Sequence, residues 1–196
     1  MQPLILASGS PYRQALLGKL GLEFTAHSPD IDESATADEA PVALAKRLAR
    51  SKARALKQQH PNALIIGSDQ VAWLEGSQLT KPGNFANALG QLQRSRGKTV
   101  TFYTGLCLYN SRDDSEQLSV ETYQASFREL SDDQLRNYLE REQPFDCAGS
   151  FKSEGLGITL FESLAGDDPN TLIGLPLIKL TEMLSLAGLD PLSANR

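Results

Sequence analysis

One acid within an apolar segment constrains the fold of this chain most strongly. The segment ALIIGSDQV, residues 63–71, begins as an apolar run and then reaches Asp69, which lies between Ser68 and Gln70. The run is typical of a buried strand, and we expect it to end on this acid. An ionised carboxylate is costly to bury unless it is paired, hydrogen-bonded or metal-bound. Asp69 therefore indicates a functional site and not packing alone.

A predicted β-hairpin follows the acid. Residues 71–74 and 78–79 are strand-like, and the turn residues Glu75-Gly76-Ser77 separate them. The chain then reaches Lys81 in the sequence LTKPG. We expect this fold-back to bring a cation near Asp69.

The order of the other predicted elements indicates an α/β fold. Strands alternate with helices in the first half of the chain, and two longer strands follow in the middle. The predicted strands are 4–7, 24–28, 98–109 and 117–130, and the main predicted helices are 11–20, 41–59, a short one from Phe85, 132–141 and 176–187. This order predicts a mixed, twisted β-sheet flanked by helices. At 196 residues and 40% hydrophobic content, the chain can bury a full core as one domain, with or without two lobes around a cleft.

Composition limits the partners of the chain. A net charge of −5 argues against sequence-independent binding to nucleic acid, which needs many phosphate-neutralising Lys and Arg side chains. Cys107 and Cys147 form no CxxC pair, so we expect reduced core cysteines and a cytoplasmic protein. The sequence contains no apolar run of the length that a membrane span requires, and residues 1–10 lack the features of a signal peptide, so we expect a protein that is not exported.

The turn after the first strand is a candidate anion site. Ser8-Gly9-Ser10 precedes a helix that starts at Pro11, and free amides at a helix start favour negative charge. Arg13 adds a cation one turn into the helix. The same residues are also typical of an ordinary N-cap, with Ser10 as the cap and Pro11 in the first turn, so the structural interpretation stays open.

Lys52 departs from the pattern of its predicted helix. The apolar positions of helix 41–59 form one face, and Lys52 shares that face with Leu48, Ala49 and Leu56. Either its ammonium reaches water along the surface, or it points into a site.

Several acids have the chemistry of divalent-metal ligands. Asp30, Asp32, Glu33 and Asp69 offer carboxylate oxygens, which Mg²⁺ and Mn²⁺ prefer. For Asp30 and Asp32 we favour a solvated turn.

Taken together, these segments resemble the Maf family of nucleotide pyrophosphatases, whose fold is related to that of the inosine triphosphatases. The resemblance covers nearly the whole chain and implies a single domain, 1–196, with a cleft between two lobes. The matching blocks are LASGSPYR at 6–13, DIDES at 30–34, SKA at 51–53, GSDQV at 67–71, KP at 81–82, YTGL at 103–106, DCAGSFKSEG at 146–155 and PNTLIGLPL at 169–177.

The resemblance implies hydrolysis of a nucleoside triphosphate between its α and β phosphates. Asp69 would be the catalytic acid and would activate the attacking water, and Glu33 would help Asp69 to hold a divalent ion, Mg²⁺, Mn²⁺ or Co²⁺. The residues that would meet the phosphates are Ser8, Ser10, Arg13, Lys52 and Lys81. A homodimer is also expected.

Three positions bear on the substrate. The family branch that acts on dTTP and UTP tends to carry Arg, Thr and Gln where this chain has Tyr12, Gln70 and Glu154. The present combination resembles the branch that hydrolyses 7-methyl-GTP. An aromatic ring and a carboxylate both suit a positively charged methylated guanine. A dTTP, UTP or other modified-nucleotide pyrophosphatase and a non-catalytic nucleotide-binding regulator of cell division are the alternatives.

Overall fold

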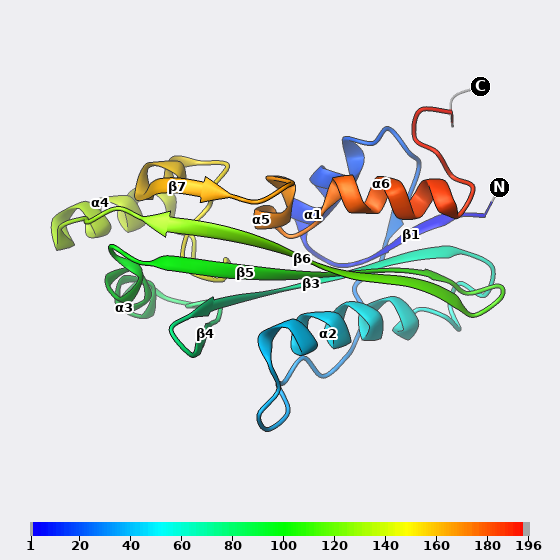
Figure 1. Cartoon of the computed structure of the whole chain (residues 1–196), viewed down its shortest axis with the longest axis horizontal. Helices are drawn as coiled ribbons and strands as arrows, with labels where there is room; N and C mark the ends of the chain where they lie inside the picture. The colour runs from blue at the N-terminus through cyan, green and yellow to red at the C-terminus, as the bar shows by residue number, and fades with distance from the viewer. Residues whose placement is uncertain (1, 194–196) are drawn as a thin grey trace. The chain divides into compact units, whose positions relative to one another are not determined.

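The computed structural model describes residues 2–193, which form two compact units. The first unit contains residues up to 70, residues 104–121 and residues from 168 onward, and the second contains 71–103 and 122–167. The strands form a seven-stranded sheet in the order β2-β1-β3-β5-β6-β7, with β4 paired to β3 (Figure 1). The predicted mixed sheet flanked by helices is confirmed, whereas a single domain 1–196 stays a prediction.

Parallel strands form the start of the first unit. Strand β1 (Leu4–Ala7) pairs in parallel with both β2 (Thr25–Ala26) and β3 (Leu64–Leu74). Strands β5 (Thr99–Asn110) and β6 (Ser115–Phe127) continue the sheet. Because β1 and β3 run in the same direction, Ser8 after β1 and Ser68 in β3 lie toward the same edge of the sheet.

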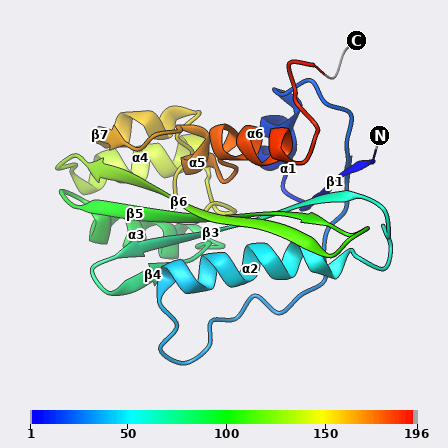
Figure 2. The ribbon, with the colours of Figure 1, turned by 45° about the vertical axis from the view of Figure 1, so that its right-hand side comes forward.

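Helices cover both faces of the strands in the first unit. Helix α2 (Pro41–Ala55) lies on one face, and α1 (Pro11–Gly18) and α6 (Leu177–Leu186) lie on the other (Figures 1 and 2). The alternation of side chains along β1 explains this arrangement, since Leu4 and Leu6 contribute to the core under α1 and α6, and Ile5 to the core under α2.

Two glycines allow α2 to approach the sheet closely. A Cβ atom on Gly67 of β3 would lie 2.1 Å from the carbonyl oxygen of Ala49, and one on Gly105 of β5 would lie 2.1 Å from that of Ala45. Neither position can therefore hold a larger residue unless the helix moves. This close contact determines how near the side chains of α2 come to those of β3.

We expect the Gly67→Ala variant to be strongly destabilised. The added methyl group overlaps the backbone of α2, so the helix must shift, at a cost of about 3 kcal/mol and a fall in Tm of roughly 10 °C. Gly90→Ala is the matched control, because a Cβ there meets nothing within 4 Å. Ala also favours a helix over Gly, so the control should melt slightly above the wild type. Equal Tm values for the two variants, measured by circular dichroism, would contradict the close contact.

The second unit contains the predicted hairpin and a core of aromatic rings. The end of β3 pairs with β4 (Ser77–Leu79) through the turn at Glu75-Gly76, as predicted. Helices α3 (Phe85–Ser95) and α4 (Asp132–Glu142) pack together, and Asn84 caps α3. Four phenylalanines make edge-to-face contacts, with ring centroids 4.9–5.8 Å apart: Phe102, Phe127, Phe151 and Phe161.

The structure differs from the sequence predictions at several elements. Strand β3 does not end on Asp69 but continues to Leu74, because Val71, Ala72 and Leu74 are also buried. Helix α2 ends at Ala55, four residues before the predicted end. Three short elements were not predicted: the 3₁₀ helix η1 (Leu156–Leu160), β7 (Phe161–Ala165) and α5 (Asn170–Ile173). Cys107 is buried, as predicted, whereas Cys147 is partly exposed. Within residues 2–193, no helix is both long enough and apolar enough to cross a membrane.

Candidate active site

Two acids and one lysine form a compact charged cluster in the first unit. The Lys52 ammonium lies 2.6 Å from Oδ1 of Asp69 and 2.7 Å from Oε1 of Glu33. Lys52 and Asp69 are only 7% and 8% exposed. A buried pair of opposite charges that is also hydrogen-bonded is strongly coupled, since little water screens it. The structure thus brings together three of the predicted site residues.

The packing of α2 explains the position of Lys52. Ala49 and Ala53 contact Gly67 closely, and Lys52 lies between them along the helix, so its side chain extends over β3 toward Asp69. The low exposure of Lys52 excludes the alternative in which its ammonium reaches water along the surface. Lys52 instead points toward Asp69 and Glu33, and its predicted contact with phosphate stays a prediction.

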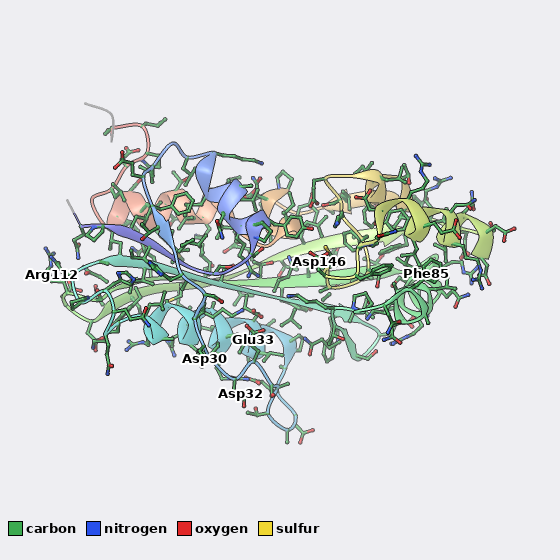
Figure 3. All side chains as sticks on the ribbon, turned by 180° about the vertical axis from the view of Figure 1, so that it is seen from behind. Asp30, Asp32, Glu33, Phe85, Arg112 and Asp146 are labelled. Atoms are coloured by element: carbon green, nitrogen blue, oxygen red, sulfur yellow. The ribbon has the colours of Figure 1, made fainter. Side chains whose placement is uncertain are left out.

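Glu33 reaches the cluster from the loop between β2 and α2. Arg47 of α2 anchors this loop, because its guanidinium donates to both carboxylate oxygens of Glu39 and to the carbonyl oxygen of Ser34. This pairing lowers the pKa of Glu39 to about 2. Asp30 and Asp32 lie on the same loop (Figure 3), but both are exposed, as predicted for a solvated turn.

The turn after β1 forms the predicted cap and also holds Arg13. The Ser10 side chain accepts a hydrogen bond from the Arg13 amide at 3.4 Å, and Ser8 Oγ accepts one from the Ser10 amide at 3.1 Å. A guanidinium nitrogen of Arg13 is 3.5 Å from Ser8 Oγ. The cap is confirmed, whereas the predicted anion site at this turn stays a prediction.

Arg13 belongs to the same electrostatic environment as the acids. Burial lowers the pKa of Arg13, and the charges of Asp69 and Glu33 raise it. Its Nε donates to the carbonyl oxygen of Gly174 at 2.8 Å, which orients the planar group. In the first unit, Lys52 thus contacts both carboxylates, and Arg13 lies close enough to feel their charge.

Gln70 points away from the cluster, as expected for the neighbour of Asp69 on a strand. Its Nε2 lies 3.1 Å from Thr104 Oγ1, and 2.8 and 3.1 Å from the carbonyl oxygens of Thr171 and Leu172. The structure therefore places Gln70 against α5.

Lys81 and Glu154 lie in the second unit. Both side chains are exposed, and Glu154 accepts a hydrogen bond from Ser153 at 3.4 Å. Their predicted approach to the acid and to a nucleotide stays a prediction. Tyr12, which is half-buried, lies in the first turn of α1 beside Arg13.

The carboxylates can hold a divalent ion only with help from other ligands. In the part of the chain that the structure describes, no group of three or more His, Cys, Asp or Glu side chains has the geometry of a metal site. Glu33 and Asp69 supply two carboxylates that converge on one point, the Lys52 ammonium. Mg²⁺ commonly uses one or two carboxylates together with water and substrate phosphates. Two carboxylates are thus enough for an ion that also binds a nucleotide, but here both contact the Lys52 ammonium, and the divalent ion stays a prediction.

Comparison with known proteins identifies the family of the chain. The model of the family described as "Maf-like protein" matches residues 3–187. The chain belongs to the Maf family. It is 54% identical to a "7-methyl-GTP pyrophosphatase" of Colwellia psychrerythraea over 98% of this chain and 96% of that protein. Proteins with the same name from Methylobacillus flagellatus and Nitrosococcus oceani are 54% and 55% identical, over 97% and 94% of this chain and 99% and 93% of theirs. The predicted resemblance to Maf proteins is confirmed.

Sequence reasoning missed residues that support the site without carrying charge. Thr104, Thr171 and Gly174 contact Gln70 or Arg13 through hydroxyl and carbonyl groups. Thr104 lies in the block YTGL, and the other two lie in PNTLIGLPL. Both blocks matched the family pattern. However, every residue has a backbone carbonyl, so the sequence does not show which carbonyl oxygens accept hydrogen bonds at the site.

Proposed function

We propose that this Maf protein hydrolyses 7-methyl-GTP to 7-methyl-GMP and pyrophosphate. The observation that carries the proposal is the buried Lys52–Asp69 pair, with Glu33 on the same ammonium, in a chain that shares about half of its residues with proteins named for this activity. A carboxylate buried near phosphate-binding cations has a clear role in hydrolysis, whereas a protein that only binds a triphosphate gains nothing from it.

In this proposal Asp69 is the general base. Its carboxylate accepts a proton from the water that attacks the α-phosphorus, and the bond from that phosphorus to the bridging oxygen breaks. Lys52 holds Asp69 in place through a 2.6 Å contact. Glu33 and Asp69 would hold the divalent ion, which when bound neutralises phosphate charge and lowers the pKa of water.

The phosphates would meet cations and hydroxyl groups at the carboxyl end of β1. Ser8, Ser10 and Arg13 lie in this turn and the start of α1, where helix amides also favour an anion. Lys52 of α2 and Lys81 complete the proposed set. Positive charge at these positions stabilises the leaving pyrophosphate, on which negative charge builds up in the transition state.

The nucleobase of the substrate would be recognised by Tyr12, Gln70 and Glu154. Methylation at N7 gives guanine a positive charge, so an aromatic face of Tyr12 attracts the ring and a carboxylate of Glu154 accepts from its N–H edge. Gln70 can contribute only its oxygen, because its amide nitrogen already donates to α5.

The products test the proposed reaction. With 7-methyl-GTP and Mg²⁺, Mn²⁺ or Co²⁺, chromatography should show 7-methyl-GMP and pyrophosphate in equal amounts. Formation of 7-methyl-GDP and inorganic phosphate would mean cleavage at the γ-phosphorus and would contradict the proposal.

We expect Glu154→Gln to lower kcat/KM for 7-methyl-GTP by about 10-fold, because a charge-assisted hydrogen bond is replaced by a neutral one. The loss with unmodified GTP should be less than about 3-fold, since that base carries no positive charge. Glu140→Gln, at an exposed position of α4, is the matched control and should behave as the wild type. Equal losses with both nucleotides would remove Glu154 from base recognition.

A further inference from the structure

Side chains of two strands hold the backbone of α5. Gln70 of β3 donates from Nε2 to the carbonyl oxygens of Thr171 and Leu172, at 2.8 and 3.1 Å. Thr104 of β5 donates to the Thr171 carbonyl oxygen at 3.0 Å and accepts from Gln70 Nε2 at 3.1 Å. Thr104 is fully buried. The Gln70 amide, the Thr104 hydroxyl and the Thr171 carbonyl form a closed hydrogen-bonded triangle, in which two N–H groups of Gln70 serve three acceptors.

The same short helix ends at the residue that orients Arg13. The carbonyl oxygen of Gly174 accepts from Arg13 Nε at 2.8 Å and from Ser68 Oγ at 2.9 Å. Gly174 has a φ of 114°, and a Cβ atom there would lie 3.3 Å from Arg13 Nε. A side chain at Gly174 is therefore strained by the backbone conformation, and its Cβ would also crowd Arg13. With Nε bound to the Gly174 carbonyl oxygen and one terminal nitrogen 3.5 Å from Ser8 Oγ, the plane of the Arg13 guanidinium is fixed at two points.

The chemistry of the acceptors defines the orientation of the Gln70 amide. Carbonyl oxygens only accept, so the nitrogen of the amide, and not its oxygen, must face α5. Gln70 Oε1 accepts no hydrogen bond from residues 2–193 and is not among their buried atoms that lack a partner, so it is open to water. The donor end of Gln70 is therefore committed to the protein.

We propose that Gln70 and Thr104 are positioning residues, which hold α5 so that the Gly174 carbonyl orients the Arg13 guanidinium toward phosphate. This rests on the proposed function, in which Arg13 meets the phosphates. This positioning role of Gln70 does not depend on the nucleobase of the substrate, and it is additional to any contact that the Gln70 side-chain oxygen makes with that nucleobase.

Pyrophosphate is the probe that isolates this role, because it has phosphates and no base. We expect Thr104→Val to weaken the binding of pyrophosphate, measured by calorimetry with Mg²⁺, by about 5- to 10-fold, the effect of losing one or two hydrogen bonds. Valine keeps the shape of threonine, and the Thr171 carbonyl oxygen still accepts from Gln70. Thr104→Ser keeps the hydroxyl group and should restore binding to within about 2-fold of the wild type.

Two further variants exclude trivial explanations. Gln70→Met, at a partly exposed position, removes the donor without a large change in volume and should weaken pyrophosphate binding at least as much as Thr104→Val. Thr99→Val is the matched control, because Thr99 lies on the same strand β5 and its hydroxyl bonds that of Ser126 in place of any group of α5, and it should bind pyrophosphate as the wild type does. Circular dichroism verifies that each variant is folded.

Kinetics provide the second readout. If Thr104 acts through Arg13, Thr104→Val should lower kcat/KM for 7-methyl-GTP and for UTP by the same factor. Three results would overturn the proposal. The first is unchanged pyrophosphate affinity in folded Thr104→Val and Gln70→Met, and the second is a loss of affinity that Thr104→Ser does not restore. The third is a wild-type protein that does not bind pyrophosphate. The proposed function can fail separately. If the wild type releases no pyrophosphate from any nucleotide, but these substitutions still change its affinity for pyrophosphate as expected, the proposed function is wrong and the positioning role stands.

Discussion

The Asp69→Asn variant should lose at least about 1,000-fold in kcat for hydrolysis of 7-methyl-GTP. Asparagine keeps the size of the side chain and an oxygen that can accept from Lys52, whose Nζ lies 2.6 Å away. It cannot take a proton from water, and general-base catalysis typically contributes 100- to 10,000-fold. The loss should appear in kcat more than in KM, because the phosphate-binding groups remain. Stopped assays with chromatographic separation of the products measure both constants.

Asp133→Asn is the matched control for this experiment. Asp133 is an exposed acid in the first turn of α4, and it carries the same change of charge. We expect its activity to stay within about 2-fold of the wild type, since an exposed acid near a helix start contributes only a few tenths of a kcal/mol to stability. An Asp69→Asn protein that retains more than a tenth of the wild-type kcat would exclude Asp69 as the base.

The Lys52→Met variant should lose about 100-fold in kcat/KM. Methionine fills much of the space of the lysine stem but removes the cation that Asp69 and Glu33 share, so the buried carboxylate of Asp69 is left without this ion-pair partner. The variant also loses one proposed partner of the leaving pyrophosphate, and removal of one such donor typically costs 100- to 1,000-fold. Initial rates over a range of nucleotide concentrations give the change.

Lys46→Met separates this effect from a general effect of charge. Lys46 lies on the same helix, α2, but is exposed, so we expect wild-type kinetics from that variant. Lys52→Arg restores the charge but not the compact shape, and its activity should fall between those of the wild type and Lys52→Met. Wild-type kinetics in Lys52→Met would mean that the cluster is structural only.

Charged site residues of the first unit could be predicted because their positions conflict with packing. Asp69 follows an apolar run and Lys52 lies on an apolar helix face, and both conflicts are resolved by their contact. Glu33 could not be selected from its neighbours by pattern alone, since Asp30 and Asp32 have the same chemistry. The structure distinguishes it by its contact with Lys52, at 2.7 Å.

The elements that sequence reasoning missed are short and bonded through their backbone. Helix α5 has only four residues, so no helical period can be read from it. In strand β7, buried and exposed residues do not alternate regularly, so the period of a strand is weak there. Strand β3 continues past Asp69 through apolar residues that belong to the second unit, so its end was placed too early. The homodimer, the cytoplasmic location and the roles of Lys81 and Glu154 stay predictions.

Pyrophosphate release from a panel of nucleotides tests the central claim most directly. The panel contains 7-methyl-GTP, GTP, UTP, dTTP and ITP, each with Mg²⁺, Mn²⁺ or Co²⁺. The account predicts a kcat/KM for 7-methyl-GTP at least about 10-fold above that of every other nucleotide, the size of one well-placed charge-assisted contact. A preference for UTP or dTTP would contradict the assignment of the substrate, and no release from any nucleotide would contradict the enzyme itself.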